Sequence, residues 1–233
     1  DEDLYLFAAD GTFAWVMLPW IWSYGGAITD AEVTQASGYL NGPETVAAYE
    51  FWLEMFNQEC FAPVVLGSGI DPYTGFAQNE YASIDNGPWS FPILQGQYPD
   101  MALYTAPFPA GEGGSINVVG GEDIVLFEQS PNKEAAAAFL RFVLSSEYQL
   151  KMAEVGQLPV RPDLIESDYI QEHPYFAVFL EQLQTSQART AHPDWQAMDE
   201  IITTAGQLIL RGERTPQEAL DAAAVEIDTL LAP

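Results

Sequence analysis

The sequence predicts a mixed α/β fold in which helices dominate, above all toward the carboxy terminus. Helix-starting patterns recur along the chain, such as Ser130-Pro131 and Thr215-Pro216. Short apolar runs bounded by Gly, Pro or Asn lie between them and are typical of strands. Hydrophobic residues make up 48% of the chain, which is enough for a buried core.

The first half of the chain is expected to alternate short strands with helices. Thr12 is the predicted cap of the first helix, and Pro19 should bend or interrupt that helix. Pro43 fits the first position of the second helix. The expected elements are strand 4–8, helix 13–24, helix 43–56, a helical turn at 76–79, and strands 81–84, 102–106, 116–119 and 124–127.

The second half is expected to be mainly helical. Ser130 is the predicted cap of one helix, and Thr215 caps the last one, with Glu218 placed for a capping box. A break is expected near His173-Pro174. The expected helices are 130–143, 145–155, 164–184 with that break, 195–210 and 215–231.

The charge balance excludes some classes of binding partner. Acidic residues outnumber basic ones by 34 to 7, which gives a formal net charge of −27. Such a chain repels phosphate backbones and anionic lipid headgroups, so we expect no nucleic-acid partner and no direct membrane insertion. The simplest interpretation is an acidic, solvated surface, and the alternative is an acidic face that binds cations. Cys60 is the single cysteine, so no intrachain disulfide or thiolate metal cluster is expected.

Sequence motifs of enzymes are missing. The chain contains no Gly-x-Ser-x-Gly, His-Glu-x-x-His, phosphate-binding loop or Gly-x-Gly-x-x-Gly. His173 and His192 each precede a proline and are interpreted as turn or surface residues. We therefore expect no catalytic residue, cofactor or metal. A carbohydrate-active hydrolase with two carboxylates stays open as an alternative, because acids are too numerous for a pair to stand out.

Aromatic residues are the more informative signal. Five of the tryptophans lie near glycines, prolines or predicted element ends, where pockets form: Trp15, Trp20, Trp22, Trp89 and Trp195. Sugars present flat apolar C–H faces that stack on indole rings, and their hydroxyls bond to carboxylates, amides and Arg. The alternative is that these tryptophans fill the core.

Several stretches together resemble a known family. They are residues 15–26, 41–56, 76–89 and 120–142, followed by Leu158-Pro-Val-Arg161 and Thr215-Pro-Gln-Glu-Ala219. In this order and spacing they resemble the family 1 extracellular solute-binding proteins of ABC transporters, a maltose-binding-protein-like group. No single motif is specific, but the series spans nearly the whole chain.

The resemblance implies a periplasmic-binding-protein-like type II fold with two α/β lobes and a ligand cleft between them. The match begins inside the family pattern, so we expect mainly the C-terminal lobe, part of the other lobe, and a missing N-terminal segment. Residues 1–119 would form the C-terminal-lobe core, 120–180 would cross to the other lobe, and 181–233 would return. Helices at 130–155 would lack part of their packing partner, which predicts exposed apolar surface or an oligomer contact.

The resemblance also implies ligand-binding residues. Trp89, in Gly87-Pro88-Trp89, matches the family's cleft tryptophan and is the main candidate for stacking on a ligand. Other candidates are the aromatics Trp15, Phe13 and Trp195, the acceptors Glu122 and Asp123, and the donor Arg161.

By this resemblance we expect a non-enzymatic substrate-binding component of an ABC importer that binds an oligosaccharide-class carbohydrate. Its partners would be the ligand and the membrane subunits of the transporter. The expected location is extracellular or periplasmic, with tethering through a missing lipoprotein or signal segment. Three alternatives stay open besides the hydrolase: a cationic solute such as a polyamine, another small solute such as a peptide or metal complex, and a module that binds nothing.

Overall fold

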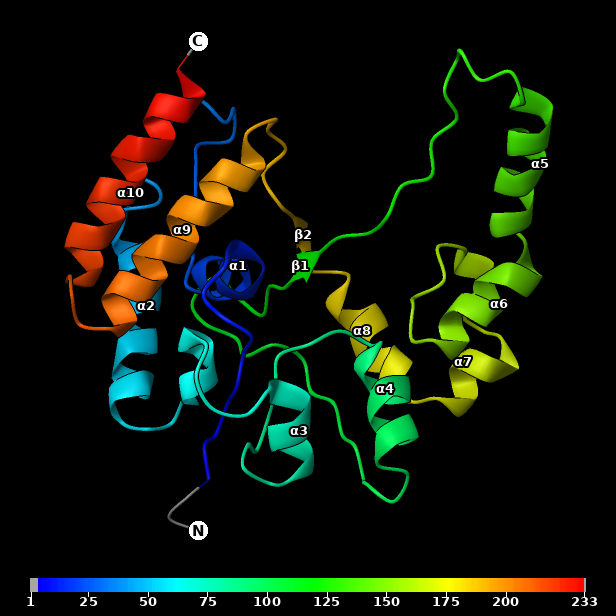
Figure 1. The fold of residues 1–233 in the computed structure, drawn as a ribbon, viewed down its shortest axis with the longest axis horizontal. Helices are drawn as coiled ribbons and strands as arrows, with labels where there is room; N and C mark the ends of the chain where they lie inside the picture. Colours follow the sequence, from blue (N-terminus) through cyan, green and yellow to red (C-terminus); the bar gives the residue numbers. More distant parts are fainter. Residues whose placement is uncertain (1–3, 233) are drawn as a thin grey trace. The chain divides into compact units, whose positions relative to one another are not determined.

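The computed structural model describes residues 4–232, and these form two compact units (Figure 1). Unit 1 comprises the chain up to Asn86, Phe108–Val119 and the chain from Thr185 onward, and unit 2 comprises Gly87–Pro107 and Gly120–Gln184. The chain therefore enters unit 2 twice. Residues 87–107 group with unit 2, although the sequence-based division counts them with the first region. The assignment of the three regions to lobes of a longer protein stays a prediction.

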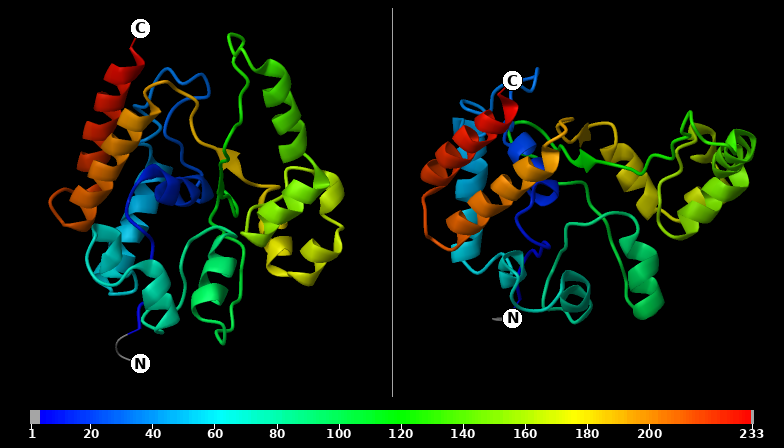
Figure 2. Two further views of the ribbon diagram at one scale, coloured as in Figure 1. Left: turned by 45° about the vertical axis from the view of Figure 1, so that its right-hand side comes forward. Right: turned by 45° about the horizontal axis from the view of Figure 1, so that its top comes forward.

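Unit 1 is built on four packed helices. Its elements are α1 (Ala14–Ser23), α2 (Pro43–Asn57), a 3-10 helix (Pro63–Leu66), α3 (Pro72–Ala77), β1 (Val118–Val119), β2 (Gln187–Ala188), α9 (Trp195–Leu210) and α10 (Pro216–Leu231). Helices α9 and α10 lie side by side, as Figure 1 and both views of Figure 2 show. The largest fully buried side chains of these helices include Trp52, Tyr49, Met198, Ile202 and Leu220, so the core lies where α1, α2, α9 and α10 meet.

Unit 2 has a smaller core. Its elements are α4 (Ser90–Gln97), α5 (Lys133–Val143), α6 (Ser146–Glu154), a 3-10 helix (Pro162–Leu164), α7 (Asp168–Glu172) and α8 (Tyr175–Gln182). Phe91 stacks on Tyr175 with ring centroids 4.0 Å apart, and Ala153, Ile170 and Phe176 complete the cluster. Helix α4 has no counterpart among the predicted elements.

The predicted strands form less sheet than expected. Strands 4–8 and 81–84 are reduced to isolated parallel bridges, such as Tyr5 with Tyr81. Strand 116–119 shortens to β1, which pairs in parallel with β2 through Val118 and Gln187. Residues 102–106 and 124–127 belong to no strand. A strand needs a hydrogen-bonded neighbour, and the described residues supply too few of them.

Two of the three predicted helix caps are wrong. The hydroxyl of Thr12 is buried and donates to the carbonyl oxygen of Thr203 in α9, 3.0 Å away, instead of capping α1. Ser130 caps no helix, because α5 starts later, after Asn132. Thr215 does form the predicted capping box with Glu218.

The predicted exposed apolar surface is confirmed. Helix α5 buries none of its residues, and Phe139 and Phe142 are 53% and 48% exposed. Residues 124–127, Ile-Val-Leu-Phe, are also exposed. Apolar area of this size marks a surface that packs against another segment or partner. No helix within residues 4–232 is both long enough and apolar enough to cross a membrane.

Candidate ligand-binding residues

The tryptophans fall into two groups by packing. Trp20 and Trp52 are buried in the core of unit 1, and Trp22 and Trp195 pack against it. Trp15 in unit 1 and Trp89 in unit 2 are half-buried, and neither joins a hydrophobic cluster of the described residues. An indole ring outside the core can offer an apolar face to a ligand. These two rings are therefore the tryptophans best placed to meet a ligand.

Two glycines create the position of Trp89 at the start of α4. A Cβ atom on Gly87 would lie 2.2 Å from Cη2 of Trp89, so the indole ring lies directly over the glycine. A Cβ atom on Gly156 would lie 2.3 Å from Cα of Trp89, and Gly156 has φ +86°. Carbon atoms in contact normally lie about 3.5–4.0 Å apart. No larger residue fits at Gly87 or Gly156 without displacing Trp89.

Trp15 lies in the first turn of α1, which is fixed by α9. Oδ1 of Asp199 accepts a hydrogen bond from the Ala14 backbone N–H at 2.6 Å, and this satisfies one of the free donors of the helix start. The guanidinium carbon of Arg189, just after β2, lies 5.5 Å from the centroid of the Trp15 ring. This is the distance of a cation–π contact.

Phe13 and Trp195 are more enclosed than expected for ligand contacts. Both pack against the core of unit 1. The indole nitrogen of Trp195 is buried and has no hydrogen-bond acceptor among the described residues. The assignment of these two aromatics to the ligand stays a prediction.

The polar candidates of unit 2 differ in whether the protein already occupies their hydrogen-bonding groups. Glu122 and Asp123 are exposed on an extended stretch that belongs to no strand. Arg161 donates to both carboxylate oxygens of Asp163, at 3.0 and 2.7 Å, and to the Leu144 carbonyl at 3.2 Å. The hydrogen bond from Arg161 holds the pKa of the Asp163 carboxyl below its usual value. The described structure therefore uses Arg161 within unit 2, and a ligand would have to compete for its donors.

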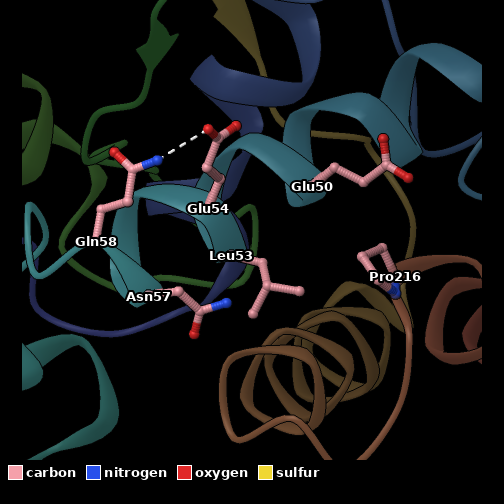
Figure 3. A pocket seen from close by; sticks show the side chains of 6 residues that line it. All are labelled: Glu50, Leu53, Glu54, Asn57, Gln58 and Pro216. Carbon is pink, nitrogen blue, oxygen red and sulfur yellow. Dashed lines mark hydrogen bonds between the residues drawn. The ribbon is translucent and has the colours of Figure 1, made fainter.

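An open depression of about 410 Å³ lies on unit 1, where α2 faces the start of α10 (Figure 3). It is lined by two carboxylates, two carboxamides and two apolar side chains: Glu50, Glu54, Asn57, Gln58, Leu53 and Pro216. Nε2 of Gln58 donates to Oε1 of Glu54 at 2.9 Å. The depression contains none of the predicted ligand-binding residues, and no sequence motif indicated it. Within residues 4–232 no cluster of His, Cys, Asp or Glu has the arrangement of a metal site.

Comparison with known proteins decides the family. A family model described as bacterial extracellular solute-binding protein matches residues 3–178. The chain belongs to this family. The family description implies an extracellular or periplasmic location for this solute-binding protein, whereas the predicted tether stays a prediction.

Curated and solved relatives agree with this assignment. A binding protein of Brucella abortus (strain 2308) is 26% identical over 214 residues, which cover 91% of this chain and 51% of the relative. The solute-binding protein thus spans about half the length of the curated relatives it matches. A solute-binding protein of an ABC transporter from Thermotoga lettingae, bound to α-D-tagatose, is 25% identical with a TM-score of 0.85 and covers 99% of this chain and 60% of that chain.

A second structure supports the fold alone. Maltose-bound MalE3 of T. maritima is 23% identical with a TM-score of 0.85, covering 98% of this chain and 61% of that chain. The predicted periplasmic-binding-protein-like type II fold is confirmed for a chain that matches about 60% of these neighbours. The family and both structures are described as binding proteins, not as enzymes.

Proposed function

We propose that this solute-binding protein is the substrate-binding component of an ABC importer and binds a carbohydrate of the oligosaccharide class. The observation that carries the proposal is the position of Trp89. Its ring is half-buried, lies over Gly87 and belongs to no hydrophobic cluster of the described residues. Sugar-bound solute-binding proteins with the same fold, one with tagatose and one with maltose, support the choice of ligand class.

Binding would use stacking and hydrogen bonds without breaking a covalent bond. The apolar C–H face of a sugar ring stacks on the indole of Trp89. Trp15 of unit 1 stays a separate candidate for contact with the ligand. The exposed carboxylates of Glu122 and Asp123 accept hydrogen bonds from sugar hydroxyls. The loaded protein then delivers the sugar to the membrane subunits of the transporter. The position of the ligand between two lobes stays a prediction.

The test is a fluorescence titration of the full-length protein with maltose, maltotriose and tagatose. Trp89→Ala should weaken sugar binding by about tenfold or more, because it removes the stacking surface. Trp22→Ala is the matched control: Trp22 is also half-buried but packs against the core, so affinity should stay within about twofold. Circular dichroism verifies that both variants fold.

Two results would reject the proposal. One is unchanged sugar affinity in Trp89→Ala, which would remove the assigned stacking residue. The other is that no sugar binds while a cationic solute does. Spermidine in the same titration therefore distinguishes the carbohydrate from the cationic alternative.

A further inference from the structure

Arg189 is placed over Trp15 by the short sheet of unit 1. It follows β2 directly, and the backbone N–H of Gln187 in β2 donates to the carbonyl of Asn117 beside β1 at 2.9 Å. Strand β1 in turn contacts α1, which carries Trp15. The guanidinium carbon lies 5.5 Å from the ring centroid, while Arg189 itself is exposed. The backbone of Arg189 is thus fixed, and its charged end meets both the indole and the solvent.

This guanidinium forms no ion pair with a carboxylate of the described residues. Ion pairs within residues 4–232 engage Lys133, Lys151, Arg161 and His192, each with an acid close in sequence, and none of them includes Arg189. Arg141, Arg211 and Arg214 also take part in no ion pair among the described residues, but Arg189 is the arginine whose guanidinium lies over an aromatic ring there. The face of Trp15 is the contact that holds it.

Three segments around this contact contain no acidic residue, although acids flank each of them. Residues 11–29, 113–119 and 185–193, which contain α1, β1 and β2, include no Asp or Glu. The carboxylate that reaches α1 from outside these segments, that of Asp199, accepts the backbone N–H of Ala14. Distant charges are screened over about 8 Å at physiological ionic strength. The segments that carry Trp15 and Arg189 therefore contribute no negative charge of their own.

We infer that Arg189 is a specificity-determining residue that favours sugars bearing a carboxylate, and that Trp15 is the positioning residue that holds its guanidinium. This inference rests on the proposed function. A guanidinium offers five N–H donors in a planar fork that matches a carboxylate, and it has no acceptor. With Arg189 over the ring, that side of Trp15 is not free for a sugar to stack on. The ligand then contacts the guanidinium of Arg189 instead of the indole of Trp15.

The experiment compares sugars that differ only at C6. The full-length protein is titrated with D-glucuronate against D-glucose and with D-galacturonate against D-galactose, and affinities are measured by calorimetry. The wild type should bind the acid of at least one pair about tenfold or more tightly than the neutral sugar, as a bidentate charge-assisted bond predicts. Arg189→Ala should abolish this preference.

Three further variants test the geometry of the cation, its positioning by Trp15, and whether an arginine elsewhere on the surface has the same effect. Arg189→Lys should keep only part of the preference, because an ammonium lacks the planar fork. Trp15→Leu should lower the acid-to-neutral ratio in the same direction as Arg189→Ala, which a merely structural role of Trp15 would not do. Arg211→Ala removes an exposed arginine at the end of α9 and should change nothing.

The outcomes also separate the inference from the proposed function. If neutral sugars bind and Arg189→Ala leaves the acid-to-neutral ratio unchanged, the role of Arg189 is refuted and the carbohydrate proposal stands. A wild type that prefers the neutral sugar of both pairs refutes it equally. If neither these sugars nor maltose and maltotriose bind, both proposals fall together.

Discussion

Gly87→Ala is the sharpest perturbation of the candidate site, because it places one methyl group under the ring of Trp89. The new Cβ atom would lie 2.2 Å from both Cη2 and Cζ3 of the indole. Since carbon contacts need about 3.5–4.0 Å, the ring has to move by more than about 1 Å. Overpacking of this kind costs about 1–3 kcal/mol, and the lower entropy of the unfolded alanine chain returns about 0.4–1 kcal/mol. We expect a net loss of about 1–2 kcal/mol in the free energy of unfolding.

The same substitution in α4 gives the control. Gly96 lies inside this helix, and a Cβ atom there would meet nothing within 4 Å. Gly96→Ala should therefore stabilise the protein, by about 0.5–1 kcal/mol, because alanine favours the helix. Urea unfolding measures both variants, and a maltotriose titration should show weaker binding only for Gly87→Ala. If Gly87→Ala matched Gly96→Ala in stability and left sugar affinity intact, the indole would not be held where the structure places it.

Three other changes have defined expected results. Burial raises the pKa of the Asp85 carboxyl to about 6, so between about pH 4 and pH 6 the native state holds a proton that the unfolded chain releases. The free energy of unfolding should therefore fall as the pH rises through this range. Asp85→Asn should abolish this dependence and add about 1–2 kcal/mol to the free energy of unfolding at pH 7, measured by urea unfolding. Thr215→Ala removes the capping box with Glu218 and should cost about 1 kcal/mol in the same assay, whereas an unchanged midpoint would contradict the cap. Asp199→Ala leaves the Ala14 N–H without its acceptor and should cost about 1–3 kcal/mol; faster amide exchange at the start of α1 would identify the cause.

The helices were predictable because their signals are local. Pro43 at the start of α2 and the Thr215–Glu218 box at the start of α10 are both found in the structure. Strands were less predictable, because a strand depends on a neighbour whose distance along the chain is not set by local sequence. Residues 124–127 have the apolar composition of a strand but no partner strand within the described residues. The predicted helix cap at Thr12 was wrong for the same reason, since its hydroxyl donates a hydrogen bond to the carbonyl of Thr203, which is distant in sequence.

The candidate site was predictable only in part. Trp89 and Trp15 follow from their motifs, and the structure separates them from the tryptophans of the core. Their contacts with Gly156 and Arg189 join segments far apart in sequence, and no local pattern connects those segments. The bond between Arg161 and Asp163 was also missed, although the two residues are close neighbours in the chain.

The exposed run at residues 124–127 has a consequence for the colloidal behaviour of the isolated polypeptide. Backbone groups that belong to no sheet, beside apolar side chains, form a template on which a strand of another molecule can add. Mutual repulsion between molecules of net charge −27 opposes that encounter at neutral pH. Acidification toward the isoelectric point near 4.1 removes the repulsion, whereas the run at residues 124–127 stays exposed. Preparations should therefore stay monodisperse in neutral buffers of low salt and become turbid on titration toward pH 4.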